Sequence, residues 1–154
     1  MRQHNLRILF FLLVLWGVAV ACSRREARFR IGVSQCSEDE WRRQMNSEIL
    51  REAHFYEDVE VDIRTAVDDN DRQAKDIREL IAEGVDLLIV APNEATPITP
   101  VVEEAYNRGI PVIVVDRKIL SDKYTAYVGA DNYEIGKAVG EYVANVLHLS
   151  LIHI

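Results

Sequence analysis

Two uninterrupted apolar runs in the middle of the chain constrain its fold more than any other feature. They read VDLLIV from Val85 to Val90 and IPVIVV from Ile110 to Val115. Each has the length of a buried strand and is too short for a buried helix. Strands that are apolar at every position are typical of a parallel sheet that is covered on both faces. The prediction is a doubly wound α/β fold with a Rossmann-like parallel sheet.

Further strands and helices are expected to alternate along the rest of the chain. Strands are predicted at residues 29–34, 59–67 and 125–130, and helices at 37–56, 69–84, 96–109 and 131–147. Ser37 is expected to cap the first helix, because Glu40 follows three residues later in a capping-box pattern. Two glycines in the last helix, Gly136 and Gly140, are interpreted as points of close packing on the sheet.

The N-terminus is predicted to be a signal peptide that covers residues 1–22. A short basic segment precedes an apolar run from Ile8 to Ala21, and this run is shorter than the roughly 18 apolar residues that a membrane span needs. It ends in Ala-Val-Ala-Cys, which resembles a lipoprotein cleavage box and makes Cys22 the expected lipidation site. An ordinary signal peptidase site and an uncleaved anchor remain alternatives. In all three cases the rest of the chain leaves the cytoplasm, and the expected location is the periplasm, with a lipid anchor or a signal anchor at the membrane.

The remaining boundaries follow from composition. Residues 23–28 are a polar linker, residues 29–147 form one lobe, and residues 148–154 (HLSLIHI) lack any capping or stop signal. This end is interpreted as a fragment edge, with non-native residues as one explanation. Lipidation of Cys22 would leave Cys36 without a disulfide partner, so Cys36 is expected to be a small buried side chain.

Charge and motifs exclude several functions. The net charge of −7 and the absence of a Lys/Arg cluster argue against a nucleic-acid partner. Only Gly32 stands where a dinucleotide-binding strand would carry three glycines, and Gly136-Lys137 is followed by Ala138, which a phosphate loop does not allow. No G-x-S-x-G elbow exists, and the histidines lack metal spacing. No enzyme activity, cofactor or metal is therefore expected.

Polar side chains follow every predicted strand, where open parallel sheets bind their ligands. These side chains offer hydrogen-bond acceptors and donors with little net positive charge, which suits a neutral polyhydroxylated ligand. Some have a structural alternative: Asp69 or Asn70 and Asp131 are expected helix caps. The residues at the strand ends are Ser34, Gln35, Asp68, Asp69, Asn70, Pro92, Asn93, Glu94, Asp116, Arg117, Asp131 and Asn132.

The chain resembles the periplasmic sugar-binding proteins of the ribose-binding and LacI-like type. The resemblance rests on GVDLLIV with the following proline, on GIPVIVVDR, and on VGADN with the following glycine, and it spans Phe29 to Val146. Within this family the chain is most similar to the sensor portions of hybrid two-component histidine kinases from Bacteroides-like bacteria. The resemblance implies two α/β lobes joined by a hinge, with a mono- or disaccharide bound between them and only the first lobe present here.

Residue roles are implied by the same resemblance. Asp116 and Arg117 are expected to bind sugar hydroxyls, and Trp41 to stack on the sugar ring, although its helical spacing also suits a core residue. Ala91 and the loop CSEDE depart from the usual family pattern, which leaves the sugar open. Asp116→Ala is expected to abolish binding with little change in stability. The expected ligand-binding residues are Ser34, Gln35, Trp41, Arg42, Asn93, Asp116, Arg117 and Asp131.

Three functions remain open. The first is the ligand sensor of a hybrid histidine kinase, which would act on a membrane signalling module. The second is a substrate-binding lipoprotein that delivers sugar to an ABC permease. The third is an enzyme that uses the same crevice, which the absence of a catalytic motif disfavours. A DNA-binding repressor is excluded, because a leader stands where its DNA-binding helices would be. The sequence that follows the second lobe would separate sensor from transporter.

Overall fold

The computed structural model describes residues 29–148 as an α/β fold on a five-stranded, all-parallel sheet with the order β2-β1-β3-β4-β5. The strands are β1 (Phe29–Gln35), β2 (Val59–Thr65), β3 (Leu87–Val90), β4 (Val112–Val115) and β5 (Ala126–Val128). β1 pairs with β2 on one side and with β3 on the other, so the strand order reverses between β1 and β3. The predicted doubly wound fold is confirmed.

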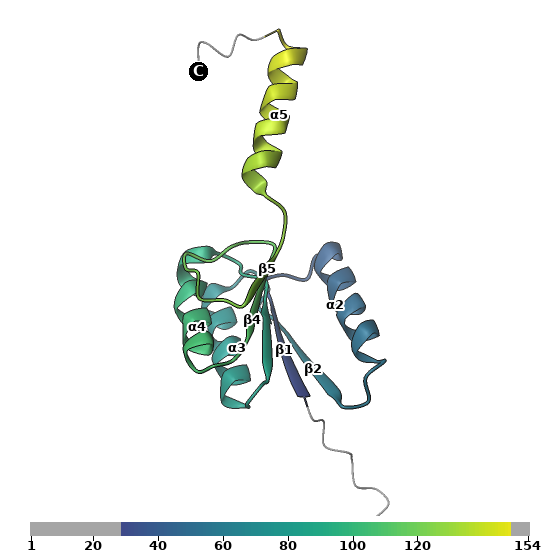
Figure 1. Cartoon of the computed structure of the whole chain (residues 1–154), viewed down its shortest axis with the longest axis vertical. Helices are drawn as coiled ribbons and strands as arrows, with labels where there is room; N and C mark the ends of the chain where they lie inside the picture. Colours follow the sequence, from purple (N-terminus) through teal and green to yellow (C-terminus); the bar gives the residue numbers. More distant parts are fainter. Residues whose placement is uncertain (1–28, 149–154) are drawn as a thin grey trace, which may run out of the picture.

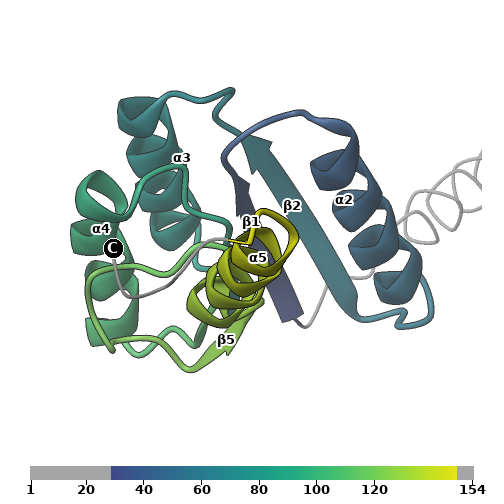
Figure 2. The same ribbon diagram turned by 90° about the horizontal axis from the view of Figure 1, so that it is seen from above.

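Helices lie on both faces of the sheet. The helix α2 (Glu40–Ala53) covers one face, while α3 (Asn70–Ala82) and α4 (Ala95–Asn107) pack against each other on the opposite face (Figures 1 and 2). The helix α5 (Asn132–Val146) follows β5. Within the described residues, no helix is long and apolar enough to cross a bilayer.

The main hydrophobic core lies between the sheet and the α3–α4 layer. Gly32 of β1 brings this layer close, because a Cβ atom there would lie 3.1 Å from Val85 and 3.2 Å from Leu80. Ala74 and Ile119 lie at its margin. The fully buried side chains of this core include Ile77, Leu80, Leu88, Val90, Ile98, Val102, Val112 and Val114.

The face of the sheet that carries α2 is less well covered than the face that carries α3 and α4. Burial alternates along the middle strands: Leu88 and Val114 are buried against α3 and α4, whereas Ile89 and Ile113 on the other face are only half-buried. The predicted cover on both faces is thus present but unequal, because the described residues place a single helix, α2, over this face. An apolar groove of about 340 Å³ lies beside α2, between Ile49 and Val61.

Side-chain caps fix the starts of three helices. Asp39, not the predicted Ser37, caps α2: it accepts a hydrogen bond from the Arg42 amide at 2.9 Å, and the Ser37 hydroxyl donates to its carboxylate at 2.6 Å. The cap lies two residues later than predicted, because α2 begins at Glu40 and Asp39 directly precedes it. The predicted caps Asp69 and Asp131 are confirmed.

The helix α5 extends away from the sheet (Figure 1). Only Ala144 in it is buried, and the large apolar side chains of Ile135, Val139 and Tyr142 are more than half exposed. A Cβ atom at Gly136 or Gly140 would meet nothing within 4 Å. The interpretation that these glycines pack on the sheet is wrong, since α5 does not lie on it.

The predicted signal peptide, Cys22, the linker and the end at residues 149–154 lie outside the described residues. Cys36 is a free, buried cysteine with 2% of its surface exposed, as expected.

Candidate functional site

The strands all run in one direction, so their carboxyl ends and the loops that follow them meet at one edge of the sheet. The reversal of strand order between β1 and β3 lies at this edge. Parallel strands diverge there into loops on opposite faces, which leaves a crevice. This edge is the candidate site.

An ion pair between Arg42 and Asp116 joins α2 to the end of β4. The Nη2 atom of Arg42 lies 2.5 Å from Oδ2 of Asp116. The Arg42 side chain is 4% exposed and that of Asp116 is 40% exposed, so the guanidinium is buried while one side of the carboxylate faces solvent. Asp39 holds the helix end that carries Arg42, and hydrogen bonds from the Ser37 hydroxyl and the Arg42 amide lower the pKa of the Asp39 carboxyl below its usual value.

Trp41 stands beside this pair with 57% of its surface exposed. The guanidinium carbon of Arg42 lies 4.6 Å from the centroid of its ring. This exposure excludes Trp41 from the core of the described residues. A flat apolar surface next to hydrogen-bonding groups is the arrangement on which the C–H face of a sugar ring can stack.

Arg117 does not pair with its neighbour Asp116. Its Nη1 atom donates to the main-chain oxygen of Asn93 at 2.5 Å, and the Asn93 amide group donates to Asn70 Oδ1 at 3.0 Å and to Asp68 O at 3.2 Å. These contacts tie together the loops that follow β2, β3 and β4. The two charges after β4 therefore reach different partners.

Gln73 of α3 connects the ends of β1 and β3 from behind the site. Its Nε2 atom donates to Ala91 O at 2.9 Å and to the Ser34 hydroxyl at 3.3 Å. Its Oε1 atom accepts a hydrogen bond from the main-chain N–H of Asn93 at 2.9 Å. Ser34 is 1% exposed and lies on the α3 side of the sheet rather than at the open edge. Sequence reasoning missed Gln73, because a glutamine inside a helical pattern gives no signal of its burial.

Two buried polar atoms at this edge have no hydrogen-bond partner among the described residues. They are Arg42 Nη1, a donor, and Gln35 Oε1, an acceptor. Gln35 is fully buried and donates through Nε2 to Asn46 of α2 at 2.5 Å. Buried polar atoms are usually satisfied, so these two atoms leave hydrogen-bonding capacity for a bound molecule with hydroxyl groups.

Asp131 is engaged as a helix cap. Its carboxylate accepts hydrogen bonds from the amides of Tyr133 and Glu134 and thereby caps α5. The structure thus brings Trp41, Arg42 and Asp116 together, joins Arg117 to Asn93, and leaves Asp131 at the start of the outlying helix.

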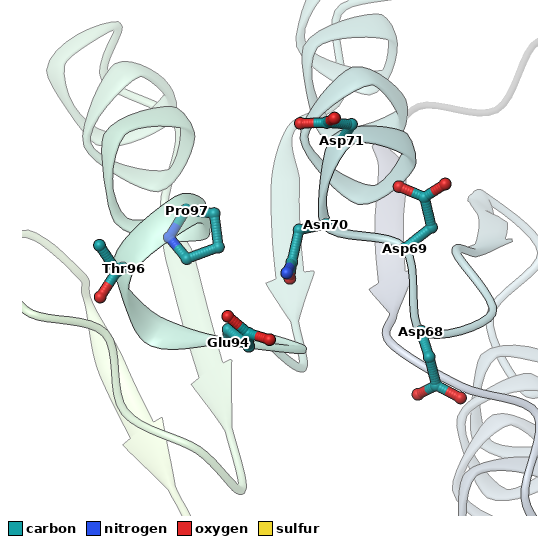
Figure 3. Close-up of a pocket in the computed structure, with 7 residues that line it drawn as sticks. All are labelled: Asp68, Asp69, Asn70, Asp71, Glu94, Thr96 and Pro97. Carbon is teal, nitrogen blue, oxygen red and sulfur yellow. The ribbon is translucent and has the colours of Figure 1, made fainter.

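A separate acidic hollow opens between the loop after β2 and the start of α4 (Figure 3). It has a volume of about 680 Å³. None of the eight predicted ligand-binding residues lines it. Among residues 29–148, no three carboxylate, thiol or imidazole groups are arranged to hold a metal ion. The lining residues are Asp68, Asp69, Asn70, Asp71, Glu94, Thr96 and Pro97.

Comparison with known proteins agrees with the fold. The protein-family model for the periplasmic binding protein domain matches residues 31–150. The solved fructose-binding periplasmic domain of the hybrid two-component system BT1754 is 67% identical, with a TM-score of 0.75, and the match covers 79% of this chain and 40% of that one.

Two curated proteins are also similar in sequence to this chain. The galactofuranose-binding protein YtfQ of Escherichia coli (strain K12) is 34% identical over 137 residues, which cover 86% of this chain and 43% of the relative. The ribose import binding protein RbsB of Bacillus subtilis (strain 168) is 33% identical over 89 residues, or 58% of this chain and 29% of the relative. The chain thus spans less than half the length of the relatives that it matches.

Proposed function

Since the chain belongs to the periplasmic binding protein domain family, we propose that it is the first lobe of a two-lobed extracytoplasmic protein that binds a neutral sugar. The observation that carries the proposal is the Arg42–Asp116 pair beside the exposed ring of Trp41. The paired carboxylate keeps free acceptor positions, and buried donor and acceptor atoms next to it lack partners among the described residues. A sugar supplies an apolar C–H face for the ring and hydroxyls that both donate and accept.

The proposed ligand is a monosaccharide of the fructose class. The 67% identity to the fructose-binding domain supports this narrower choice over the wider range of mono- and disaccharides. Gln35, Trp41, Arg42, Asp116 and Arg117 are the proposed ligand contacts at this edge. Arg117 would have to leave Asn93 O to reach the ligand. The other predicted residues are proposed to support the site without touching the ligand. Ser34 and Asn93 hold the strand ends and loops, and Asp131 caps α5.

A second lobe is the proposed partner of α5. This helix carries large apolar side chains that are exposed all along it, and an unpacked amphipathic helix is rarely stable by itself. We therefore propose that the first lobe ends near Ala130 and that α5 is the first helix of the second lobe. This boundary is earlier than the one at residue 147 that the helical pattern predicts.

The proposed role of the complete protein is that of a ligand sensor in a hybrid two-component histidine kinase, anchored at the membrane by Cys22 or by its leader. Sugar binding would close the two lobes and bias the signalling unit. The similarity to import binding proteins keeps delivery of sugar to an ABC permease as the second candidate. A transmembrane helix and a kinase region after the second lobe would favour the sensor.

Calorimetric titration of the complete two-lobed protein tests the ligand. The panel contains fructose, ribose, galactose, glucose and sucrose, and Arg43→Gln serves as a control, because Arg43 is an exposed neighbour of Arg42 on the same helix. We expect fructose to bind with the lowest Kd of the panel. The substitution Trp41→Ala should raise the Kd for fructose at least tenfold. A folded protein that binds no member of the panel would contradict the proposal.

A further inference from the structure

Asp116 has a left-handed main-chain conformation, with a φ angle of 68°. This region is unfavourable for residues with a Cβ atom, and asparagine and aspartate tolerate it better than most. Strained residues persist only where their surroundings hold them. With this conformation the Asp116 carboxylate lies 2.5 Å from Arg42 Nη2.

Both main-chain polar groups of Asp116 are held by β5. Its N–H donates to Val128 O at 2.8 Å, and its carbonyl oxygen accepts a hydrogen bond from the Tyr127 hydroxyl at 2.7 Å. Tyr127 is half-buried, packs against the main core and has Lys118 Nζ 4.9 Å from its ring centroid. Its hydroxyl is thus fixed from several sides.

Gly129 leaves the space that the Tyr127 hydroxyl occupies. A Cβ atom on Gly129 would lie 2.2 Å from this hydroxyl oxygen and 3.1 Å from Asp116 O. No side chain at position 129 is compatible with this arrangement unless the tyrosine moves. Tyr127 and Gly129 therefore form a matched pair around the main chain of Asp116.

The same hydroxyl also lies 3.3 Å from Ala130 O, in the segment that leads from β5 to α5. A phenol has one proton to donate, so the shorter bond to Asp116 O is the stronger one. The hydroxyl thus lies between the main chain of the proposed ligand-binding carboxylate and the connection to the outlying helix.

We propose that Tyr127 is a positioning residue for ligand binding: its hydroxyl holds Asp116 in the left-handed conformation that presents the carboxylate to Arg42 and to the sugar. Tyr127 itself does not touch the ligand. The inference rests on the proposed function, since the carboxylate that it positions is the proposed sugar contact.

The test is Tyr127→Phe in the complete two-lobed protein, with Tyr124→Phe as the matched control. Tyr124 is also half-buried against the main core, and its hydroxyl makes no hydrogen bond within residues 29–148. Loss of one hydrogen bond to a strained carbonyl should raise the Kd for fructose about tenfold, whereas Tyr124→Phe should change it less than twofold. An unchanged Kd in Tyr127→Phe would overturn the inference, while a wild type that binds no sugar would contradict the proposed function instead.

A double-mutant cycle separates positioning from general destabilisation. In the Asp116→Asn background, Tyr127→Phe should add less than about a twofold rise in Kd, because it acts through that carboxylate. A full tenfold loss in this background would mean that Tyr127 acts by another route, and would also overturn the inference.

A ligand-independent measurement completes the test. In a crystal structure of sugar-free Tyr127→Phe, the φ angle of Asp116 should leave the left-handed region or its carboxylate should separate from Arg42. Gly129→Ala should have the same effect by displacing the hydroxyl, whereas Gly136→Ala should not. Unchanged geometry at Asp116 in both variants would contradict the inference whatever the ligand proves to be.

Discussion

The Arg42 guanidinium lies 2.5 Å from the Asp116 carboxylate, although 74 positions separate the two residues in the sequence. Burial divides the pair unequally: the Arg42 side chain is 4% exposed and that of Asp116 is 40% exposed. A buried charge depends on its partner more than a hydrated one does. Loss of the Asp116 carboxylate therefore leaves a buried guanidinium unpaired, which costs more than loss of the guanidinium would cost the hydrated carboxylate.

Asp116→Ala should lower the free energy of unfolding by about 2 kcal/mol, because it leaves a buried guanidinium without its counter-ion. This revises the sequence-based expectation that the substitution leaves stability nearly unchanged. Urea unfolding measures the effect, and Asp122→Ala, at an exposed position, is the control. Equal stability of Asp116→Ala and wild type would show that water replaces the carboxylate at no cost.

Arg42→Gln should raise the Kd for the sugar about thirtyfold, which corresponds to about 2 kcal/mol of lost hydrogen bonding to a charged group. Arg43→Gln should leave the Kd within a factor of two, because the exposed Arg43 pairs with Glu40 rather than with Asp116. Calorimetry on both variants gives the comparison. Similar losses in the two would indicate a general electrostatic effect rather than a specific contact.

The cap of α2 should make stability depend on pH. The pKa of the Asp39 carboxyl is lowered in the folded state, first by the Ser37 hydroxyl and then by the Arg42 amide. A lowered folded-state pKa stabilises the fold above the unfolded value of about 3.9, and this contribution disappears as the pH falls through the folded value.

Asp39→Ala should consequently be less stable than wild type at pH 7, and the difference should shrink below about pH 4. Glu38→Ala is the matched control, since Glu38 is exposed and lies one residue away. Thermal unfolding at several pH values measures the difference. A gap between Asp39→Ala and wild type that stays constant from pH 7 to pH 3 would contradict the cap as its source.

Substitution of Gly136 and Gly140 by alanine should have opposite effects on stability in this chain alone and in the complete two-lobed protein. In this chain alone, each substitution should stabilise α5 by about 1 kcal/mol, because a Cβ atom meets nothing within 4 Å. In the two-lobed protein the double substitution should be destabilising, because glycines allow a helix to approach its neighbour closely.

Circular dichroism of the chain and thermal unfolding of the two-lobed protein test this pair of expectations. Asn145→Ala, at an exposed position of the same helix, controls for helix propensity. Stabilisation of both proteins by the double substitution would mean that the glycine face of α5 stays exposed beside a second lobe.

Most of the fold follows from local pattern, whereas most of the site does not. The apolar run at Leu87–Val90 and the caps Asp69 and Asp131 are predictable, because strand burial and capping depend on residues a few positions apart. The partner of Asp116 is not, since Arg42 comes from another element and arginines on helices are usually solvated. Tyr127 escapes prediction for the same reason: its role depends on the space left by Gly129 and on a carbonyl after β4.

The position of α5 is a different kind of limit. Its periodic apolar residues predict an amphipathic helix correctly, but periodicity does not identify what the apolar side packs against. The glycines Gly136 and Gly140 suggest close packing on the sheet, yet nothing within 4 Å would meet a Cβ atom at either position. The described residues contain no surface that covers it.

The location of β1 inside the sheet has a consequence for how the lobe folds. This strand is the first of those in residues 29–148, yet it needs β2 on one side and β3 on the other, so residue 31 pairs with residues 61 and 87. Such non-local parallel pairing is slow. Until residues 87–90 have left the ribosome, one hydrogen-bonding edge of β1 has no native neighbour and can pair with another nascent chain. Pieces of this protein that stop between β2 and β3 should therefore be markedly more prone to aggregate than pieces that include β3.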